Sequence, residues 1–171
     1  MSTLFVDTIN EKTTNNGVYI PGHVLQVKRQ ESSTKIVLAS ESFVDVLSIS
    51  ITPSATTSTF LISTFIHGYN AAANGGAIRI LRDSTEIFDP NNLNSSNQHY
   101  YSYSSANYYP TYPICYLDSP STTSAIAYKI QMCRYGAAAG SVWFNGGGNN
   151  RVGTSSLSLI HISEPTRQAM I

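Results

Sequence analysis

The segment Ser42-Phe-Val-Asp-Val-Leu-Ser-Ile-Ser-Ile51 decides the fold class, because apolar and polar residues alternate along most of its length. Alternation with a period of two places successive side chains on opposite faces of a β-strand. The residues expected on its buried face are Phe43, Leu47, Ile49 and Ile51. Asp45 falls on the same face and does not fit the pattern.

Strand patterns separated by turn residues recur outward from this segment, and helical periodicity is nearly absent. The nearly continuous apolar run at 59–67 predicts a strand covered on both faces. A hairpin is expected over 75–87, with a turn at Asp83-Ser84 in which Asp83 bonds its own backbone. Further strands are expected over 111–118, 125–135 and 141–145. The sequence therefore predicts an all-β sandwich or barrel.

Composition limits the range of functions. The 171 residues are enough for one domain with a sizeable core, and the net charge is zero. Charged residues form 12% of the chain and are scattered, which argues against a nucleic-acid groove or an anionic membrane surface as partner. No apolar stretch is long enough for a transmembrane helix, and the first residues lack the features of a signal peptide.

The two cysteines, Cys115 and Cys133, cannot form a metal site by themselves. A tight hairpin between their segments would align Cys115 with a residue near Ala127, not with Cys133. Free, buried thiols of a protein made in a reducing cytoplasm are expected, with a disulfide as the alternative.

Catalytic signatures are absent from the sequence. His23, His67 and His99 are widely spaced, and no nucleophile, zinc or phosphate-loop motif accompanies them. Asp83 and Asp118 are expected in turns, where aspartate accepts hydrogen bonds from backbone N–H groups. The four acids best placed to meet across strands are Asp45, Asp83, Glu86 and Asp118. The stretch Gly146-Gly-Gly148 lacks the helix and lysine of a phosphate site, so a flexible connection is expected. We expect no enzyme, no metal and no cofactor.

Six of the eleven tyrosines lie between His99 and Pro113, among Ser, Asn and Ala. Such mixtures are typical of recognition loops, which combine rigid rings with small hydrogen-bonding groups. The receptor-binding candidates are Tyr100, Tyr101, Tyr103, Tyr108 and Tyr109. The alternatives are that this segment packs internally or against another subunit, or that it is disordered. Trp143 points opposite to its neighbours and is either a half-buried platform or an interface residue.

Four motifs occur in order in the first 27 residues: Val6-Asp-Thr-Ile9, Lys12-Thr13, Asn16-Gly-Val18 and Pro21-Gly-His-Val-Leu-Gln-Val27. In this order they resemble the beginning of small tail-fibre-like virion proteins of marine bacteriophages. Further motifs of this resemblance are Ser48-Ile-Ser-Ile-Thr-Pro53, Arg79-Ile-Leu-Arg-Asp83, Leu117-Asp-Ser-Pro120, Tyr128-Lys-Ile-Gln131 and Gly153-Thr-Ser-Ser156. The resemblance implies a jelly-roll-like antiparallel head over 28–156 on a short extended stem, residues 1–27.

The same resemblance implies a homotrimer in the virion, assembled in the bacterial host cytoplasm. The N-terminal segment would bind other virion proteins, and the head would bind a host-surface carbohydrate or protein receptor. Neither nucleic acid nor membrane insertion is expected. A capsid decoration or neck protein is the second hypothesis, and a small polysaccharide depolymerase with two close carboxylates is the third.

Residues 157–171 resemble an in-frame translation of a transposase-type sequencing adapter, from Leu157-Ser-Leu-Ile-His-Ile162 through Ser-Glu-Pro-Thr-Arg167. We therefore expect that a native last strand after Ser156 has been replaced. The substitute still alternates roughly, so it can form a strand. No functional role is expected for His161, Glu164 or Arg167.

Overall fold

The computed structural model describes residues 24–71, 75–88, 107–135, 140–147 and 153–162. These residues form strands and connections, with no helix among them. The strands are β1 (Val24–Ser32), β2 (Ile36–Leu38), β3 (Val44–Ile51), β4 (Thr59–Asn70), β5 (Gly75–Arg82), β6 (Thr85–Phe88), β7 (Thr111–Asp118), β8 (Ile126–Tyr135), β9 (Val142–Phe144) and β10 (Ser155–Ile162).

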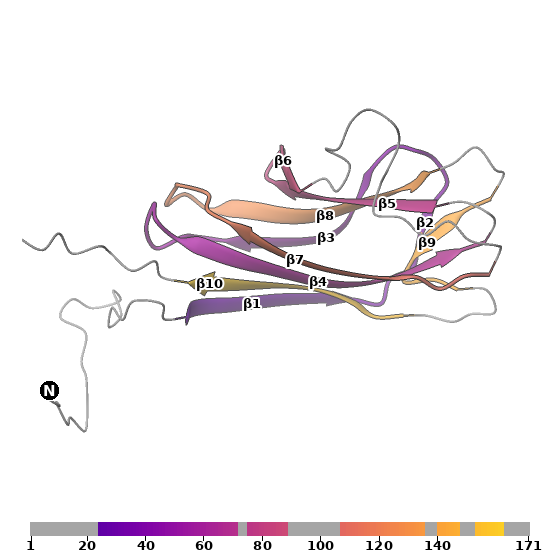
Figure 1. The fold of residues 1–171 in the computed structure, drawn as a ribbon, viewed down its shortest axis with the longest axis horizontal. Helices are drawn as coiled ribbons and strands as arrows, with labels where there is room; N and C mark the ends of the chain where they lie inside the picture. The colour runs from indigo at the N-terminus through magenta and orange to yellow at the C-terminus, as the bar shows by residue number, and fades with distance from the viewer. Residues whose placement is uncertain (1–23, 72–74, 89–106, 136–139, 148–152, 163–171) are drawn as a thin grey trace, which may run out of the picture.

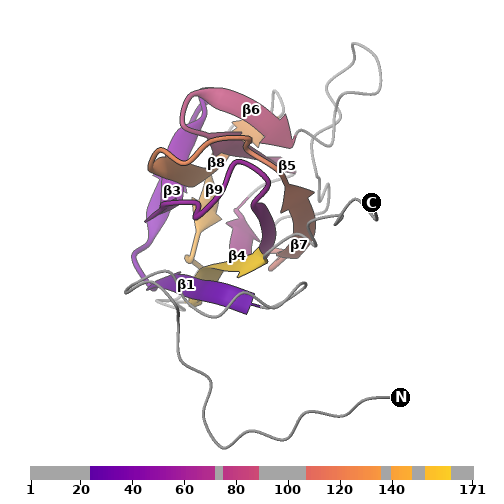
Figure 2. The same cartoon turned by 90° about the vertical axis from the view of Figure 1, so that its left-hand side faces the viewer.

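The strands make two antiparallel sheets that pack face to face (Figures 1 and 2). One sheet runs β1-β10-β4-β7. The short strands β9 and β2 extend this sheet past the first residue of β10, where β9 pairs with the last residues of β4 and β2 pairs with β9. The other sheet runs β3-β8-β5-β6. The strand orders β1-β10-β4-β7 and β3-β8-β5-β6 are those of a jelly roll, which confirms the predicted all-β, jelly-roll-like fold.

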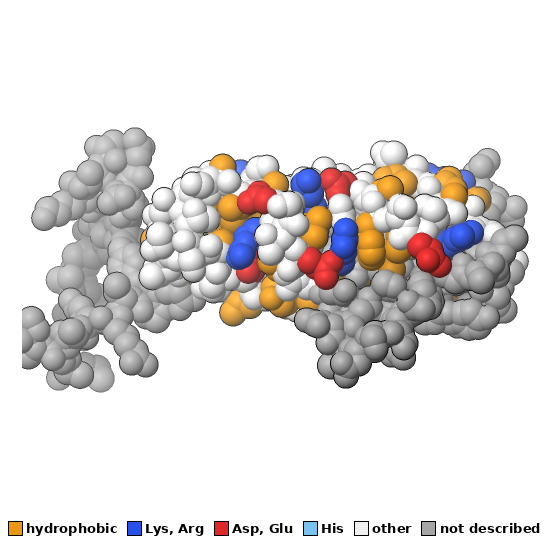
Figure 3. All heavy atoms as spheres, turned by 90° about the horizontal axis from the view of Figure 1, so that it is seen from above, with side chains coloured by type: hydrophobic (Ala, Val, Ile, Leu, Met, Phe, Trp, Pro, Cys, Tyr) orange, Lys and Arg blue, Asp and Glu red, His pale blue; other side chains and the backbone are white. Residues whose placement is uncertain are grey.

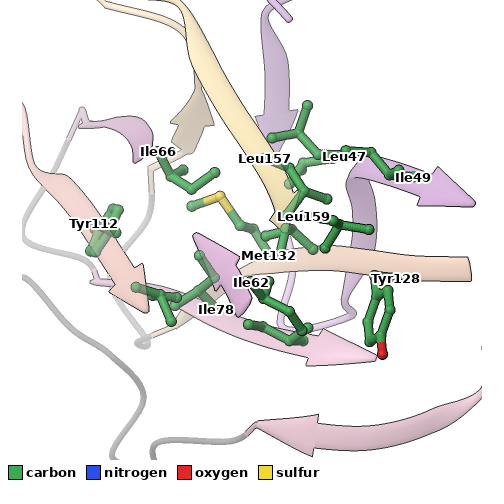
Figure 4. Close-up of a cluster of buried hydrophobic side chains, with 14 of the residues drawn as sticks. Leu47, Ile49, Ile62, Ile66, Ile78, Tyr112, Tyr128, Met132, Leu157 and Leu159 are labelled. Atoms are coloured by element: carbon green, nitrogen blue, oxygen red, sulfur yellow. The ribbon is translucent and has the colours of Figure 1, made fainter. Parts of the chain in front are cut away.

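The core lies between the sheets and is built by the alternating residues of each strand. In β8, the residues predicted to share one face, Ile126, Tyr128, Ile130 and Met132, are all buried. Figure 4 shows Met132 and Ile78 of one sheet facing Ile62, Leu157 and Leu159 of the other. Burial of this apolar surface is the main stabilising contribution, at about 25 cal/mol per Å².

Asp45 is accommodated by an irregularity of β3. The pairing of β3 with β8 shifts between Asp45 and Leu47, so that Val46 and Leu47 are both buried. This bulge turns Asp45 outward, where its carboxylate accepts a hydrogen bond of 2.6 Å from the Gln131 side chain. The one extra residue of the bulge therefore keeps Asp45 out of the core, where strict alternation would have placed it.

Two local predictions were wrong. The outer face of β4 is not covered, because Ser63 and Phe65 are exposed there, with Phe65 47% accessible. Asp83 does adopt the expected turn between β5 and β6, with φ 54°. However, its carboxylate accepts a bond of 2.8 Å from the Ala127 N–H of β8 and not from its own turn.

The strand β10 crosses the boundary expected at residue 157 and lies between β1 and β4, inside the sheet. Leu157 and Leu159 enter the core, and His161 is also buried. The His161 ring stacks on Phe60 with centroids 4.6 Å apart, and its Nε2 lies 2.7 Å from the Ser58 hydroxyl. The adapter-like residues thus satisfy the alternation that this position in the sheet requires.

The fully buried side chain of Asn145 connects three separate segments of the six-stranded sheet. Its Nδ2 donates to the carbonyl oxygens of Ser32, at 2.6 Å, and of Thr34, at 3.3 Å, across the break between β1 and β2. Its Oδ1 accepts the hydroxyl of Ser155, whose oxygen in turn accepts the His67 N–H. The Asn145 N–H donates to the His67 carbonyl at 3.0 Å. We call these contacts the Asn145 junction.

Two glycines allow the chain to close around this junction. A Cβ atom at Gly153 would lie 2.8 Å from the Cβ of His67, and one at Gly146 would lie 2.9 Å from that of Trp143. Gly146 is buried, so the described part of the glycine-rich connection is packed and not the flexible segment that was predicted.

Replacing Asn145 with Ala should lower the free energy of unfolding by about 3 kcal/mol, because buried backbone carbonyls and a hydroxyl lose their partners. Ser121→Ala is the matched control, since Ser121 shares the left-handed backbone (φ 54° for both residues) but is exposed. We expect it to cost about 1 kcal/mol in urea denaturation. Equal losses would show that the junction contributes nothing beyond its backbone conformation.

The stability of the fold should decrease below pH 6.5 because of His161. Burial holds the pKa of His161 below its ordinary value of 6.5. The unfolded chain therefore binds the proton first as the pH falls, and stability is lost from 6.5 down to the folded-state pKa. His161→Leu should remove this part of the pH dependence of unfolding, while Ser58 keeps its bond from the Ala55 N–H. An unchanged slope in the variant would contradict the assignment.

Candidate ligand-binding site

Two of the five candidate tyrosines, Tyr108 and Tyr109, lie in the described residues, and both are exposed, at 46% and 44%. Tyr100, Tyr101 and Tyr103 lie outside the described residues. The described pair therefore defines the geometry of the site.

The backbone of this tyrosine segment is fixed to the end of β4. The N–H groups of Gly68 and Asn70 donate to the carbonyls of Pro110 and Tyr108, both at 2.9 Å. The Asn107 N–H donates back to the Asn70 carbonyl at 2.9 Å. Because three backbone bonds hold it, the segment presents its rings with little loss of conformational entropy on binding.

Three aromatic rings form a continuous group beside this segment. The Tyr109 ring lies 4.9 Å from the ring of Tyr69, which lies 5.1 Å from Trp143, centroid to centroid. Tyr69 is only 3% exposed, and its hydroxyl donates to Asn107 Oδ1 at 2.6 Å. Tyr69 therefore acts as a buried support for the two outer rings. We call Tyr69, Tyr109 and Trp143 the aromatic platform.

The platform is completed by a cation. Lys35, in the break between β1 and β2, places its Nζ 3.3 Å from the centroid of the Trp143 ring. Trp143 is half-buried and points away from the core, as the alternation with buried Val142 and Phe144 predicted.

Sequence reasoning missed Tyr69 and Lys35. Tyr69 lies just beyond the segment predicted as a strand, and β4 in fact continues to Asn70. Lys35 is 108 positions from Trp143 in the sequence. The two residues come together because Val37 of β2 pairs with Trp143 of β9, which in turn pairs with Tyr69 of β4. An alternating pattern at 59–70 was the one signal that could have indicated Tyr69.

The platform lies at the end of the sandwich opposite the beginning of β1. In Figure 1, β1 begins and β10 ends at the left, whereas β2, β9 and the last residues of β4 lie at the right. A chain attached through residues preceding β1 would thus present the platform at its far end.

Each of the four candidate acids has a hydrogen-bond or ion-pair partner of its own. Asp118 was predicted to lie in a turn, but it is the last residue of β7 and is buried. It accepts both 2.9 and 3.0 Å bonds from Arg82 and a 2.6 Å bond from the Tyr128 hydroxyl, which ties one sheet to the other. Burial, followed by the bond to Asp118, strongly raises the pKa of Tyr128. Glu86 pairs with Arg79 at 2.8 Å.

The cysteines are free, as predicted, but Cys115 is exposed on the outer face of β7 and not buried. Burial raises the pKa of the Cys133 thiol from 9.0 to about 11, which keeps it protonated and unreactive. Among the described residues, no group of three His, Cys, Asp or Glu could hold a metal ion. The same residues contain no helix of the length and apolarity that crossing a membrane requires.

The outer faces of the two sheets differ in charge. Figure 3 shows acidic and basic side chains side by side on the four-stranded sheet, where Lys129 lies 3.4 Å from Asp45. On the other sheet, the edge strand β1 carries the exposed pair Arg29–Glu31, whereas the residues of β4, β7 and β10 include one charged side chain, the buried Asp118. A row of aligned apolar residues crosses this second face, formed by Leu117, Leu61, Ile160 and Val27. We call it the apolar row.

No protein-family model and no curated protein matches this chain. Among solved structures, it aligns with the VP2 subviral particle of infectious bursal disease virus at a TM-score of 0.44 and 11% identity, covering 81% of this chain and 40% of that one. The T13 particle of the same virus aligns at a TM-score of 0.43 and 9% identity, covering 92% and 40%. The chain thus spans about two fifths of the length of these proteins.

Proposed function

We propose that this chain is a structural protein of a phage virion, of the tail-fibre type, whose head binds a host-surface glycan through the aromatic platform. Its resemblance to tail-fibre-like virion proteins supports the assignment to a phage particle. Tyr109 would stack on a sugar ring, with Tyr108 as a further contact, while Trp143 holds Lys35 on its ring face. Tyr100, Tyr101 and Tyr103 belong to the same proposal as further contacts.

The observation that carries the proposal is the rigid presentation of exposed rings at one end of the sandwich. Tyr109 is 44% exposed although its neighbours are fixed by three backbone bonds to β4. Exposed aromatic side chains that lie together are typical of interaction sites, and rigid rings lose little entropy on binding. Copies arranged around an axis, as the resemblance implies, would gain avidity from weak individual sites.

A second candidate function, that of a decoration or neck protein without a receptor, is favoured by the apolar row. Val27 and Leu117 of that row are 60% and 56% exposed, and Phe65 lies on the same face. An exposed apolar row of this kind is suited to packing against another protein. In this role, the sheet face and not the platform would carry the essential contacts.

Changing Tyr108 and Tyr109 together to Ala should weaken binding of the full-length chain to host cells at least tenfold, since aromatic anchors dominate binding energy. Phe65→Ala is the matched control, because Phe65 has the same exposure but lies on the outer sheet face. Circular dichroism and urea denaturation would establish that both variants fold.

Retained cell binding by the tyrosine variant would contradict the receptor role. If Phe65→Ala alone abolished incorporation into particles, the second candidate would replace the first. The molar mass of the full chain, measured by light scattering, tests the avidity argument. We expect a mass of three chains, and a monomer would remove multivalency from the proposal.

A further inference from the structure

We propose that the ligand of the aromatic platform is an anionic saccharide whose carboxylate pairs with the ammonium group of Lys35. This inference rests on the proposed function and adds the class of the sugar.

The first observation is that Lys35 differs from the other lysines and arginines of the described residues. Each of the others contacts an oxygen atom: Lys28 the Ser50 carbonyl, Arg29 Glu31, Arg79 Glu86, Arg82 Asp118, Lys129 Asp45 and Arg134 the Gly140 carbonyl. Within that part of the chain, the contact made by the Lys35 ammonium is the face of Trp143. An ammonium on a ring face keeps N–H donors for a further acceptor.

The second observation is that the position of Lys35 is built into the fold. Asn145 Nδ2 holds the preceding carbonyls of Ser32 and Thr34, so the turn that carries Lys35 is fixed. Gly146 leaves room for the lysine stem, since a Cβ there would lie 3.0 Å from Lys35 Cγ. The charge is therefore held at the edge of the platform before any ligand binds.

The chemistry of the combined surface suits a sugar acid. The exposed Tyr109 ring can contact the apolar face of a pyranose, and the ammonium held on the Trp143 ring can form a charge-assisted hydrogen bond with a carboxylate. A nucleic acid is a poorer match, because a phosphate backbone is bound by several cations, whereas the platform offers one among the described residues.

The test is binding of the full chain to an array of neutral and carboxylated glycans, followed by titration of the bound glycan and its methyl ester. We expect about a tenfold preference for the free acid, the size of one hydrogen bond to a charged group. The preference should shrink as salt is added. Lys35→Gln should abolish it, and Lys35→Arg should retain it.

Lys129→Gln is the matched control, because it removes the same charge from the opposite sheet face. Equal binding of acid and ester by the wild type would overturn this inference and leave the proposed function intact. Equal loss of preference in both glutamine variants would also overturn it, since net charge alone would then explain the effect. Failure to bind any glycan would instead contradict the proposed function itself.

Discussion

The buried amide of Asn145 is the contact on which the arrangement of the six-stranded sheet depends. Two neighbouring strands of this part of the sheet are interrupted, the edge strand β1/β2 at residues 33–35 and the interior strand β9/β10 at residues 145–154. Interrupted strands leave backbone groups without ladder partners, and such groups are costly when buried. The Asn145 side chain supplies two donors and an acceptor to these groups. The two breaks therefore lie next to each other, at Asn145.

The candidate site depends on the same junction. The break in β1/β2 directs Lys35 over Trp143, and Gly146 next to Asn145 leaves the space for both side chains. On the other side, the Asn145 N–H binds the His67 carbonyl in β4, two residues before Tyr69. A jelly roll without these breaks would have a regular sheet edge in place of the platform.

The sequence predicted the features that depend on local alternation. The strand β7 has the predicted bounds, the hairpin turns at Asp83, and the inward residues of β8 are those of the pattern. Alternation cannot predict partners from distant segments, which is why the Asp118–Arg82 pair between sheets was missed. Cys115 was predicted to be buried because it lies in an alternating segment, but it is exposed. Alternation shows that a strand has two different faces and does not show which face is covered.

The same reasoning explains how β10 forms from adapter-like residues. A position between two strands requires apolar residues at every second place, and Leu157 and Leu159 meet this requirement. We propose that residues 157–171 are derived from an adapter. The buried His161, whose neutral form the core favours, is consistent with a segment that was not selected for this environment.

The aromatic platform is the proposed glycan-binding site, and the composition of the chain allows binding there to be measured directly. Trp143 is the single tryptophan of the protein, so its fluorescence reports on the platform without any label. Titration of the full chain with a glycan that it binds should change the intensity or wavelength of that emission saturably, with the same midpoint as binding. Unchanged tryptophan emission at a saturating concentration of that glycan would place the binding site elsewhere and contradict the account.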